Sequence, residues 1–242
     1  MIETEHLRKE FGDVVAVEDL SLRIPPGEFF GFLGPNGSGK TTTIKLLTGL
    51  LRPTRGRALI GGHDIQQEHL AAKRLIGYVP DTPYLYEKLT AREFLRFVGD
   101  LYELPEAALK QRIPELLDLF GLTPVADRLI EDYSHGMRQK AVMAACLLHE
   151  PRVIIIDEPM VGLDPQSAHL VKTILREQCR QGVSVFMSTH TLSLAEDVCD
   201  RVGIILKGRL VALGTVTELK QQFGSEGDLE DLFLDLTGRI VQ

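Results

Sequence analysis

The chain has 242 residues, of which 44% are hydrophobic and 25% are charged, a composition typical of a globular protein. Its formal net charge of −7 argues against a nucleic-acid-binding surface, because such surfaces usually carry a basic stripe. The longest apolar run, residues 141–148, is far shorter than the ~18 residues that a membrane-spanning helix needs. A function at a membrane would therefore require another chain to cross the bilayer.

The three cysteines, Cys146, Cys179 and Cys199, are too widely spaced for a metal knuckle or a redox pair. We interpret them as reduced thiols of a cytoplasmic protein. Residues 1–5 have neither the basic start nor the apolar stretch of a signal peptide, which favours the same compartment.

Short strand-like segments dominate the beginning of the chain, and turn-forming residues such as Gly12-Asp13 and Pro25-Pro26-Gly27 separate them. The predicted strands are residues 2–7, 14–17, 20–24, 29–33 and, after a helix that ends at Gly49, 57–60.

Between residues 82 and 150 the apolar residues recur with a helical period. The predicted helices are 91–102, 106–120 and 137–149, and Pro114 is expected to kink or restart the second of them.

Strands and helices alternate in the remaining part of the chain, which predicts a parallel sheet with right-handed crossovers. The predicted strands are 153–156, 183–187 and 202–206, and the predicted helices are 166–181 and 193–199. Lys207-Gly208 predicts a hairpin turn, and two further helices are expected at 216–223 and 229–236.

A glycine-rich stretch lies between the strand at 29–33 and the helix that follows it. Its glycines let consecutive backbone N–H groups turn inward, and the positive end of the helix dipole adds to their attraction for an anion. Lys40 contributes a full charge, and Thr41 contributes a hydroxyl for Mg²⁺. The predicted nucleotide-phosphate site consists of Gly34, Pro35, Asn36, Gly37, Ser38, Gly39, Lys40, Thr41 and Thr42.

Polar residues also follow two other predicted strands: Asp157-Glu158 after 153–156, and Ser188-Thr189-His190 after 183–187. Ligands of open parallel sheets bind at the carboxyl ends of the strands, so we expect these side chains beside the phosphate site. Asp157 would hold Mg²⁺, and Glu158 would orient the water in line with the terminal phosphate. The alternative is that the two acids only cap the next turn.

These patterns predict an α/β fold, namely a P-loop NTPase with a mostly parallel central sheet, an N-terminal antiparallel β-subdomain and an inserted helical subdomain. We assign residues 1–81 and 151–213 to the ATP-binding core with its β-subdomain, 82–150 to the helical subdomain, and 214–242 to a C-terminal helical extension.

The order of the motifs resembles the ATP-binding subunits of ABC transporters over nearly the whole chain. The motifs are GPNGSGKT at 34–41, YSHGMRQK at 133–140, IIIDEP at 154–159, GLDP at 162–165, and His190. The resemblance implies that Ser134 and Gly136 form a signature loop facing the γ-phosphate of ATP held by a partner subunit. It also implies that His190 contacts the γ-phosphate and that Asp164 lies in a loop crossing the dimer interface. Phe11 would stack on adenine, unless it is an ordinary core residue of the β-subdomain.

Two parts of the chain depart from the usual family pattern. His135 and Met137 stand at a glycine and a glutamine position of the signature. Asp81 replaces the glutamine expected at the start of the helical insertion, where it would bind Mg²⁺ through water. Both variants, and the tail at 229–238, look like the exporter-type branch of the family.

The resemblance implies an ATPase with ATP and Mg²⁺ as cofactors, working as a head-to-tail pair. Its partners would be a transmembrane permease subunit, driven in the direction of export, and a second ATP-binding subunit, identical or paralogous. We expect no nucleic-acid partner and a peripheral location on the cytoplasmic face of the membrane. The alternatives are a soluble ABC-type ATPase without a transporter and a nucleotide-binding regulatory module that never turns over.

Overall fold

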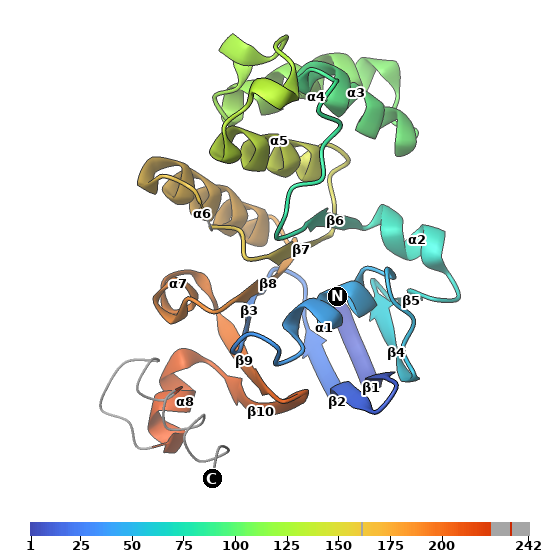
Figure 1. Cartoon of the computed structure of the whole chain (residues 1–242), viewed down its shortest axis with the longest axis vertical. Coiled ribbons are helices and arrows are strands. Elements are labelled where there is room, and N and C mark those ends of the chain that lie inside the picture. The colour runs from blue at the N-terminus through green and yellow to red at the C-terminus, as the bar shows by residue number, and fades with distance from the viewer. Residues whose placement is uncertain (161, 224–232, 234–242) are drawn as a thin grey trace.

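The computed structural model describes residues 1–160, 162–223 and 233. Two β-sheets form the body of the molecule, and helices from the middle of the sequence lie at one end of it, at the top of Figure 1. The predicted α/β fold, with an antiparallel N-terminal sheet, a mostly parallel sheet and an inserted helical segment, is confirmed. The domain boundaries stay a prediction.

The smaller sheet is antiparallel, and its strands in spatial order are β2 (Val14–Ile24), β1 (Ile2–Phe11), β4 (Arg55–Ile60) and β5 (His63–Asp64). The prediction of two strands at 14–17 and 20–24 is wrong, because β2 is continuous. Register shifts in the pairing of β1 with β2 let Val17 and Leu20 both face the core, although a regular strand would turn them to opposite faces.

The larger sheet has six strands, which in spatial order are β10 (Arg209–Gly214), β9 (Arg201–Leu206), β3 (Phe29–Leu33), β8 (Ser184–Thr189), β7 (Val153–Asp157) and β6 (Ile76–Val79). All neighbours are parallel except β9 and β10. These two form the predicted hairpin, in which Lys207 and Gly208 have the positive φ values, 48° and 79°, of a two-residue turn.

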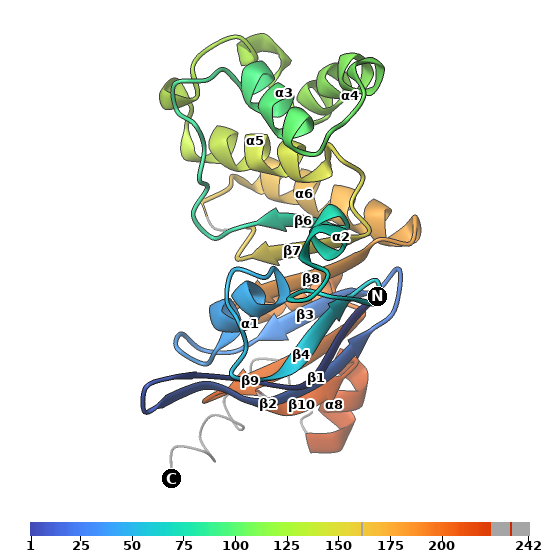
Figure 2. The ribbon, with the colours of Figure 1, turned by 90° about the vertical axis from the view of Figure 1, so that its right-hand side faces the viewer.

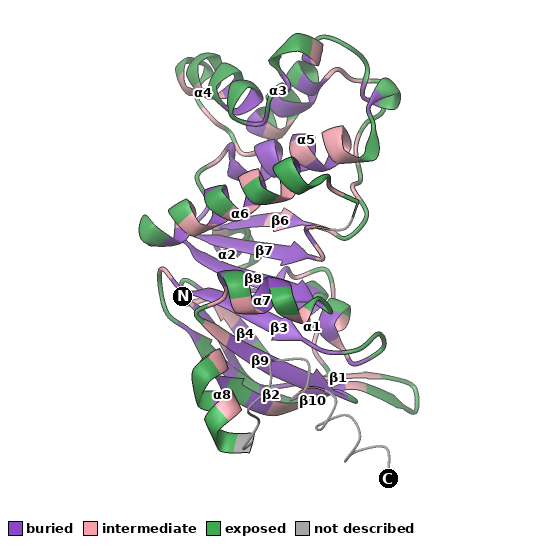
Figure 3. Ribbon diagram, turned by 90° about the vertical axis from the view of Figure 1, so that its left-hand side faces the viewer, coloured by how far each residue is buried: buried purple, intermediate pink, exposed green. Residues whose placement is uncertain are grey.

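Helices cover both faces of the larger sheet. On one face, α1 (Lys40–Leu47) lies between the two sheets, where Ile44 packs in the same cluster as Phe32 and Phe186. The other face packs against α5 (His135–Leu147), α6 (Pro165–Arg180) and α7 (Leu192–Val198). The central strands β3, β7 and β8 are therefore buried on both sides (Figure 3), which explains why β3 and β7 are almost entirely apolar.

The inserted segment consists of α3 (Ala91–Leu101), α4 (Glu106–Leu119), 3₁₀ turns at Thr123–Val125 and Ile130–Asp132, and α5 (Figure 2). Thr90 and Glu93 form a capping box that begins α3. The restart expected at Pro114 does not occur, and α4 is continuous. Proline removes one N–H donor, whose i−4 acceptor would be the carbonyl of Lys110, an exposed residue where water can replace the lost bond.

Some elements lie outside the predictions or outside the described residues. The short α2 (His69–Arg74) and the edge strands β5 and β6 were not predicted. The helix α8 (Val216–Phe223) agrees with its prediction, whereas the helix expected at 229–236 lies outside the described residues except for Phe233. None of the helices within the described ranges is long and apolar enough to span a bilayer.

A stacked pair of rings connects the helical segment to β6. Tyr102 follows α3 and His149 follows α5, and their ring centroids are 3.7 Å apart with planes at 15°. His149 Nε2 lies 3.0 Å from the carbonyl oxygen of Ile76, and the Tyr102 hydroxyl donates to the same oxygen over 3.3 Å. Burial lowers the pKa of His149 to about 4, so this imidazole is neutral at pH 7.

The stability of the protein should therefore fall as the pH is lowered from 6.5 to 4. In the unfolded chain His149 is protonated below its ordinary pKa of 6.5, whereas in the folded chain it resists protonation until about 4. Each pKa unit corresponds to about 1.4 kcal/mol, so this residue should contribute a loss of about 3 kcal/mol in the free energy of unfolding across the window.

His149→Gln tests this expectation, because the glutamine amide can still donate to Ile76 but does not titrate. The melting temperature of this variant should depend less on pH between 6.5 and 4 than that of the wild type. The exposed His169 in α6 offers the matched control, His169→Gln. An identical pH dependence in His149→Gln and wild type would contradict the role of His149.

Candidate functional site

The glycine-rich loop joins the end of β3 to the start of α1 in the middle of the larger sheet. Gly37 and Gly39 have φ values of 77° and 111°, which favour glycine. A Cβ atom on Gly34 would lie 2.4 Å from the carbonyl oxygen of Ile205, and one on Gly39 would lie 2.4 Å from that of Ala16. The loop can therefore approach its neighbours closely only because these positions lack side chains.

Lys40 lies inside this loop with 7% of its surface exposed. Its ammonium donates to the carbonyl oxygens of Gly34 (2.7 Å) and Pro35 (3.2 Å). Burial lowers the pKa of Lys40, while the charges of Glu158 and Asp157 oppose the shift. Ser38 Oγ is buried without a hydrogen-bond partner in the described residues. A buried cation on neutral acceptors and an unpaired hydroxyl fit an anionic group such as a phosphate.

The Mg²⁺ half of the site joins the start of α1 to the end of β7. Thr41 Oγ1 donates to Asp157 Oδ2 over 3.1 Å, and Ser188 Oγ donates to Asp157 Oδ1. A hydroxyl and a carboxylate oxygen at this separation fit Mg²⁺, which usually takes few protein ligands and completes its octahedron with phosphate and water oxygens. No cluster of three or more His, Cys, Asp or Glu side chains that could hold a metal occurs among the described residues.

Asp81 lies just beyond β6, the strand that pairs with β7, and is exposed. Burial raises the pKa of the neighbouring Tyr78 to about 12, with smaller contributions from the charges of Asp157 and Asp81. Because β6 and β7 are parallel neighbours, Asp81 after β6 and Asp157 at the end of β7 both lie at the carboxyl edge of the sheet. Its contact with Mg²⁺ stays a prediction.

Glu158 follows β7 in a strained conformation with a φ of 50°. Its backbone N–H donates to the carbonyl oxygen of Ser188 over 3.1 Å, which fixes it beside β8. Glu158 Oε1 lies 2.8 Å from Nδ1 of His190, and Oε2 accepts a hydrogen bond from the Thr189 hydroxyl over 3.2 Å. The structure therefore brings Glu158 and His190 together, as expected from the strand order.

Phe11 lies at the end of β1, next to the turn of the β1–β2 hairpin, and 48% of its surface is exposed. Lys9 Nζ lies 4.9 Å from the ring centroid. The alternative of an ordinary core residue is therefore wrong. An exposed aromatic ring can stack on a purine, and this assignment stays a prediction.

The signature segment lies away from the glycine-rich loop. Ser134 caps α5 by accepting a hydrogen bond from the Met137 N–H over 3.3 Å. Ser134 and the helix that it begins belong to the inserted helical segment, whereas Lys40 begins α1 directly after the loop that follows β3. The signature segment instead approaches residues 162–164: a Cβ on Gly162 would lie 2.6 Å from His135 Cδ2, and one on Gly136 would lie 3.7 Å from Leu163.

Asp164 uses its carboxylate to begin α6. Oδ1 accepts from the N–H groups of Gln166 and Ser167, both over 3.0 Å, and Oδ2 accepts from the Ser167 hydroxyl over 2.5 Å. These hydrogen bonds lower the pKa of Asp164. A nucleotide contact of Asp164 stays a prediction, and the geometry observed is that of a helix cap.

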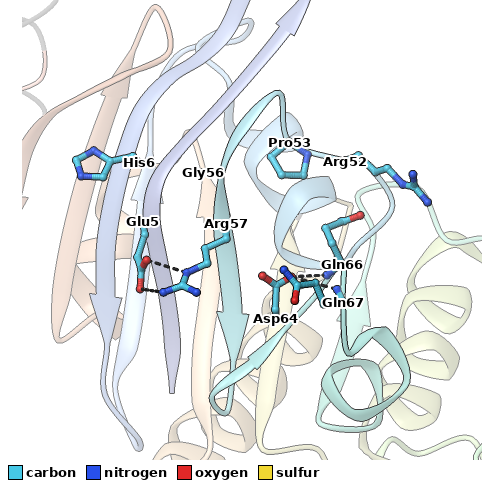
Figure 4. A pocket seen from close by; sticks show the side chains of 9 residues that line it. All are labelled: Glu5, His6, Arg52, Pro53, Gly56, Arg57, Asp64, Gln66 and Gln67. Carbon is cyan, nitrogen blue, oxygen red and sulfur yellow. Dashed lines mark hydrogen bonds and ion pairs between the residues drawn. The ribbon is translucent and has the colours of Figure 1, made fainter.

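Of two cavities in the structure, one adjoins the candidate catalytic groups and the other does not. A cavity of about 660 Å³ lies on the smaller sheet, where Arg57 pairs with Glu5 and Asp64 Oδ1 accepts from the N–H groups of Gln66 and Gln67 (Figure 4). Its polar groups largely satisfy one another. A cavity of about 540 Å³ is lined by both Glu158 and His190 and extends between α6 and α7. The second cavity therefore adjoins the candidate catalytic groups.

Two contacts were not predicted from the sequence: the hydrogen bonds from Ser188 to Asp157 and from Thr189 to Glu158. A signal for them was available, because both residues directly precede His190 at the end of a predicted strand.

Comparison with known proteins identifies the family. A family model described as ABC transporter matches residues 17–161. An uncharacterized ABC transporter ATP-binding protein of Nostoc is 44% identical over 85% of this chain and 62% of its own length, so the chain spans less than two thirds of that relative. The linearmycin resistance ATP-binding protein LnrL of Bacillus subtilis is 39% identical over 93% of this chain and 73% of its own length.

A solved structure gives the same result. The ATP-binding subunit of an ABC transporter superposes with a TM-score of 0.93 at 36% identity, covering 98% of this chain and 99% of that chain. The chain therefore belongs to the ABC transporter family, as one of its ATP-binding proteins.

Proposed function

We propose that this chain hydrolyses ATP and thereby drives a separate membrane-spanning subunit. The observation that carries the proposal is the convergence at one sheet edge of a buried lysine in a glycine-rich loop, the Thr41–Asp157 contact and the Glu158–His190 contact. Phosphoryl transfer depends on positioning and charge stabilisation, and these residues supply both.

In the proposed reaction, Lys40 and the backbone N–H groups of residues 34–42 bind the β- and γ-phosphates of ATP. Thr41 and Asp157 would hold Mg²⁺, and Asp81 would bind the same ion through a water molecule. The ion would neutralise part of the charge of the phosphates. Glu158 orients the attacking water and accepts its proton. His190 uses Nδ1 for Glu158, which leaves Nε2 to reach the γ-phosphate.

The active form in this proposal is a head-to-tail pair of ATP-binding subunits, identical or paralogous. The positions of Ser134 and Gly136 support it, because they lie at the start of α5 in the inserted helical segment, whereas the glycine-rich loop joins β3 to α1 in the larger sheet. The Ser134 hydroxyl accepts from Met137 and keeps its own proton for a γ-phosphate of the partner's ATP. Phe11 would stack on the adenine.

The proposed partner in transport is a permease that spans the membrane, which would place this chain on the cytoplasmic face of the membrane. Export is the direction we propose, supported by the similarity to LnrL, which is named a linearmycin resistance ATP-binding protein. ATP would close the pair and hydrolysis would reopen it, so that the permease alternates between two states. In this proposal the permease, and not this chain, binds the transported substrate.

Glu158→Gln should preserve ATP binding and lower the rate of hydrolysis at least roughly 100-fold, because an amide cannot accept the proton of the attacking water. Steady-state ATPase activity and retention of labelled ATP provide the measurements. Glu115→Gln in α4, an exposed position, is the matched control and should behave as wild type. Full turnover in Glu158→Gln would remove Glu158 from the proposed role, and absence of turnover in wild type and control would instead favour a regulatory module.

Lys40→Ala should weaken ATP binding at least roughly 100-fold, since it removes a charge-assisted contact inside the loop. Titration calorimetry with ATP and Mg²⁺ measures the effect. Lys45→Ala, an exposed lysine of the same helix, should retain the wild-type affinity. Equal affinities of Lys40→Ala and wild type would refute the assignment of the loop.

Purification of the tagged chain from detergent-solubilised membranes should yield a polytopic membrane protein in stoichiometric amount. Such a complex would distinguish a transporter subunit from an ATPase of the same fold that works without a transporter. Recovery of the chain only in soluble complexes, while it still hydrolyses ATP, would contradict the transport proposal and leave the ATPase proposal intact.

A further inference from the structure

Thr189, the last residue of β8, is almost fully buried, with 1% of its surface exposed. Its hydroxyl oxygen accepts a hydrogen bond from the backbone N–H of Thr191 over 3.0 Å. The same hydroxyl lies 3.2 Å from Glu158 Oε2. Because a backbone N–H can only donate, it occupies a lone pair of the hydroxyl, and the single hydroxyl proton is left for the carboxylate. The direction of the hydrogen bond from Thr189 to Glu158 is therefore determined.

The two groups that hold the Glu158 carboxylate differ in their surroundings. His190 contacts Oε1, but 57% of its side chain is exposed, compared with 13% for Glu158. Thr189 is fixed by the sheet, since its position in β8 pairs with Leu33 of β3. The buried hydroxyl is thus the more rigid support of the carboxylate, while the exposed imidazole keeps its Nε2 available for a phosphate.

We propose that Thr189 is a positioning residue for hydrolysis: its hydroxyl holds one oxygen of Glu158 so that the other points to the attacking water. In this role Thr189 acts through Glu158, to which its hydroxyl donates. The backbone of Glu158 is already fixed by its N–H bond to Ser188 and its φ of 50°, so the remaining freedom lies in the side chain, where Thr189 acts. This inference rests on the proposed function of Glu158.

The test compares Thr189→Val, which has nearly the same shape without the hydroxyl, with Thr189→Ser, which keeps the hydroxyl. Thr189→Val should lower kcat for ATP hydrolysis roughly 10- to 100-fold and change KM by less than about threefold, because misplacing a catalytic group affects the chemical step rather than binding. Thr189→Ser should recover most of kcat. Thr191→Val is the matched control, since the Thr191 side chain makes no capping bond and is exposed.

Three further measurements separate the positioning of Glu158 by Thr189 from a role of Thr189 in folding the turn after β8. Labelled nucleotide bound to Thr189→Val should be mostly ATP, as in Glu158→Gln, and the melting temperature should stay close to that of Thr191→Val. In the Glu158→Gln background, Thr189→Val should not lower the residual single-turnover rate further, because the carboxylate it positions is absent.

Wild-type kcat in Thr189→Val, or the same fold-loss in both backgrounds, would overturn the positioning role. The positioning role would also be overturned if Thr189→Val raised KM or lowered the melting temperature while kcat stayed at the wild-type value. These outcomes differ from failure of the proposed function, in which wild type itself does not hydrolyse ATP or Glu158→Gln remains fully active.

Discussion

The register of the parallel strands β3, β8 and β7 decides where the polar groups of the site lie. Leu33 pairs with Thr189, and Asp157 pairs with Ser188, so the three strands end at one level. The glycine-rich loop, the two carboxylates and the imidazole consequently leave the sheet along one edge. A slip of one residue in β7 would reverse the faces of its side chains and separate Asp157 from Ser188 and Thr41. Burial of the strands on both faces opposes such a slip, because it would mismatch two packed layers.

At this edge the charged groups are held by neutral polar partners. Lys40 is bound by loop carbonyls, Asp157 by two hydroxyls, and Glu158 by Thr189 in addition to His190. The positive φ of Glu158 costs of order 1–3 kcal/mol, and its hydrogen bonds to β8 offset part of that strain. Groups that are already oriented need little reorganisation when phosphate charge develops in the reaction, which is the main requirement for electrostatic catalysis.

The sequence predicted the parts of the fold and site that depend on local pattern. The strands ending at Leu33 and Asp157 are fully buried apolar runs followed by polar residues, and such runs are visible without tertiary information. Strand β6 was missed because it is short and contains Gly77, whose missing side chain leaves room for Cys146 of α5. The sequence places Thr189 and Glu158 at the ends of two predicted strands, but their hydrogen bond depends on strand register, and the capping by Asp164 depends on loop conformation. Phe11 was left open between core and surface because hairpin twist decides its exposure.

The position of α5 relative to α1 has a consequence for how nucleotide and partner would act on each other. Since the signature residues lie at the start of α5 and the glycine-rich loop lies at the end of β3, each chain offers two incomplete surfaces. In the proposed pair, the γ-phosphate is the one group that both surfaces contact. The free energy by which ATP strengthens the pair must then equal that by which the pair strengthens ATP binding, because the coupling is reciprocal. Loss of the γ-phosphate removes this coupling from both subunits at that site, so hydrolysis of the bound ATP would weaken the contact between the two subunits.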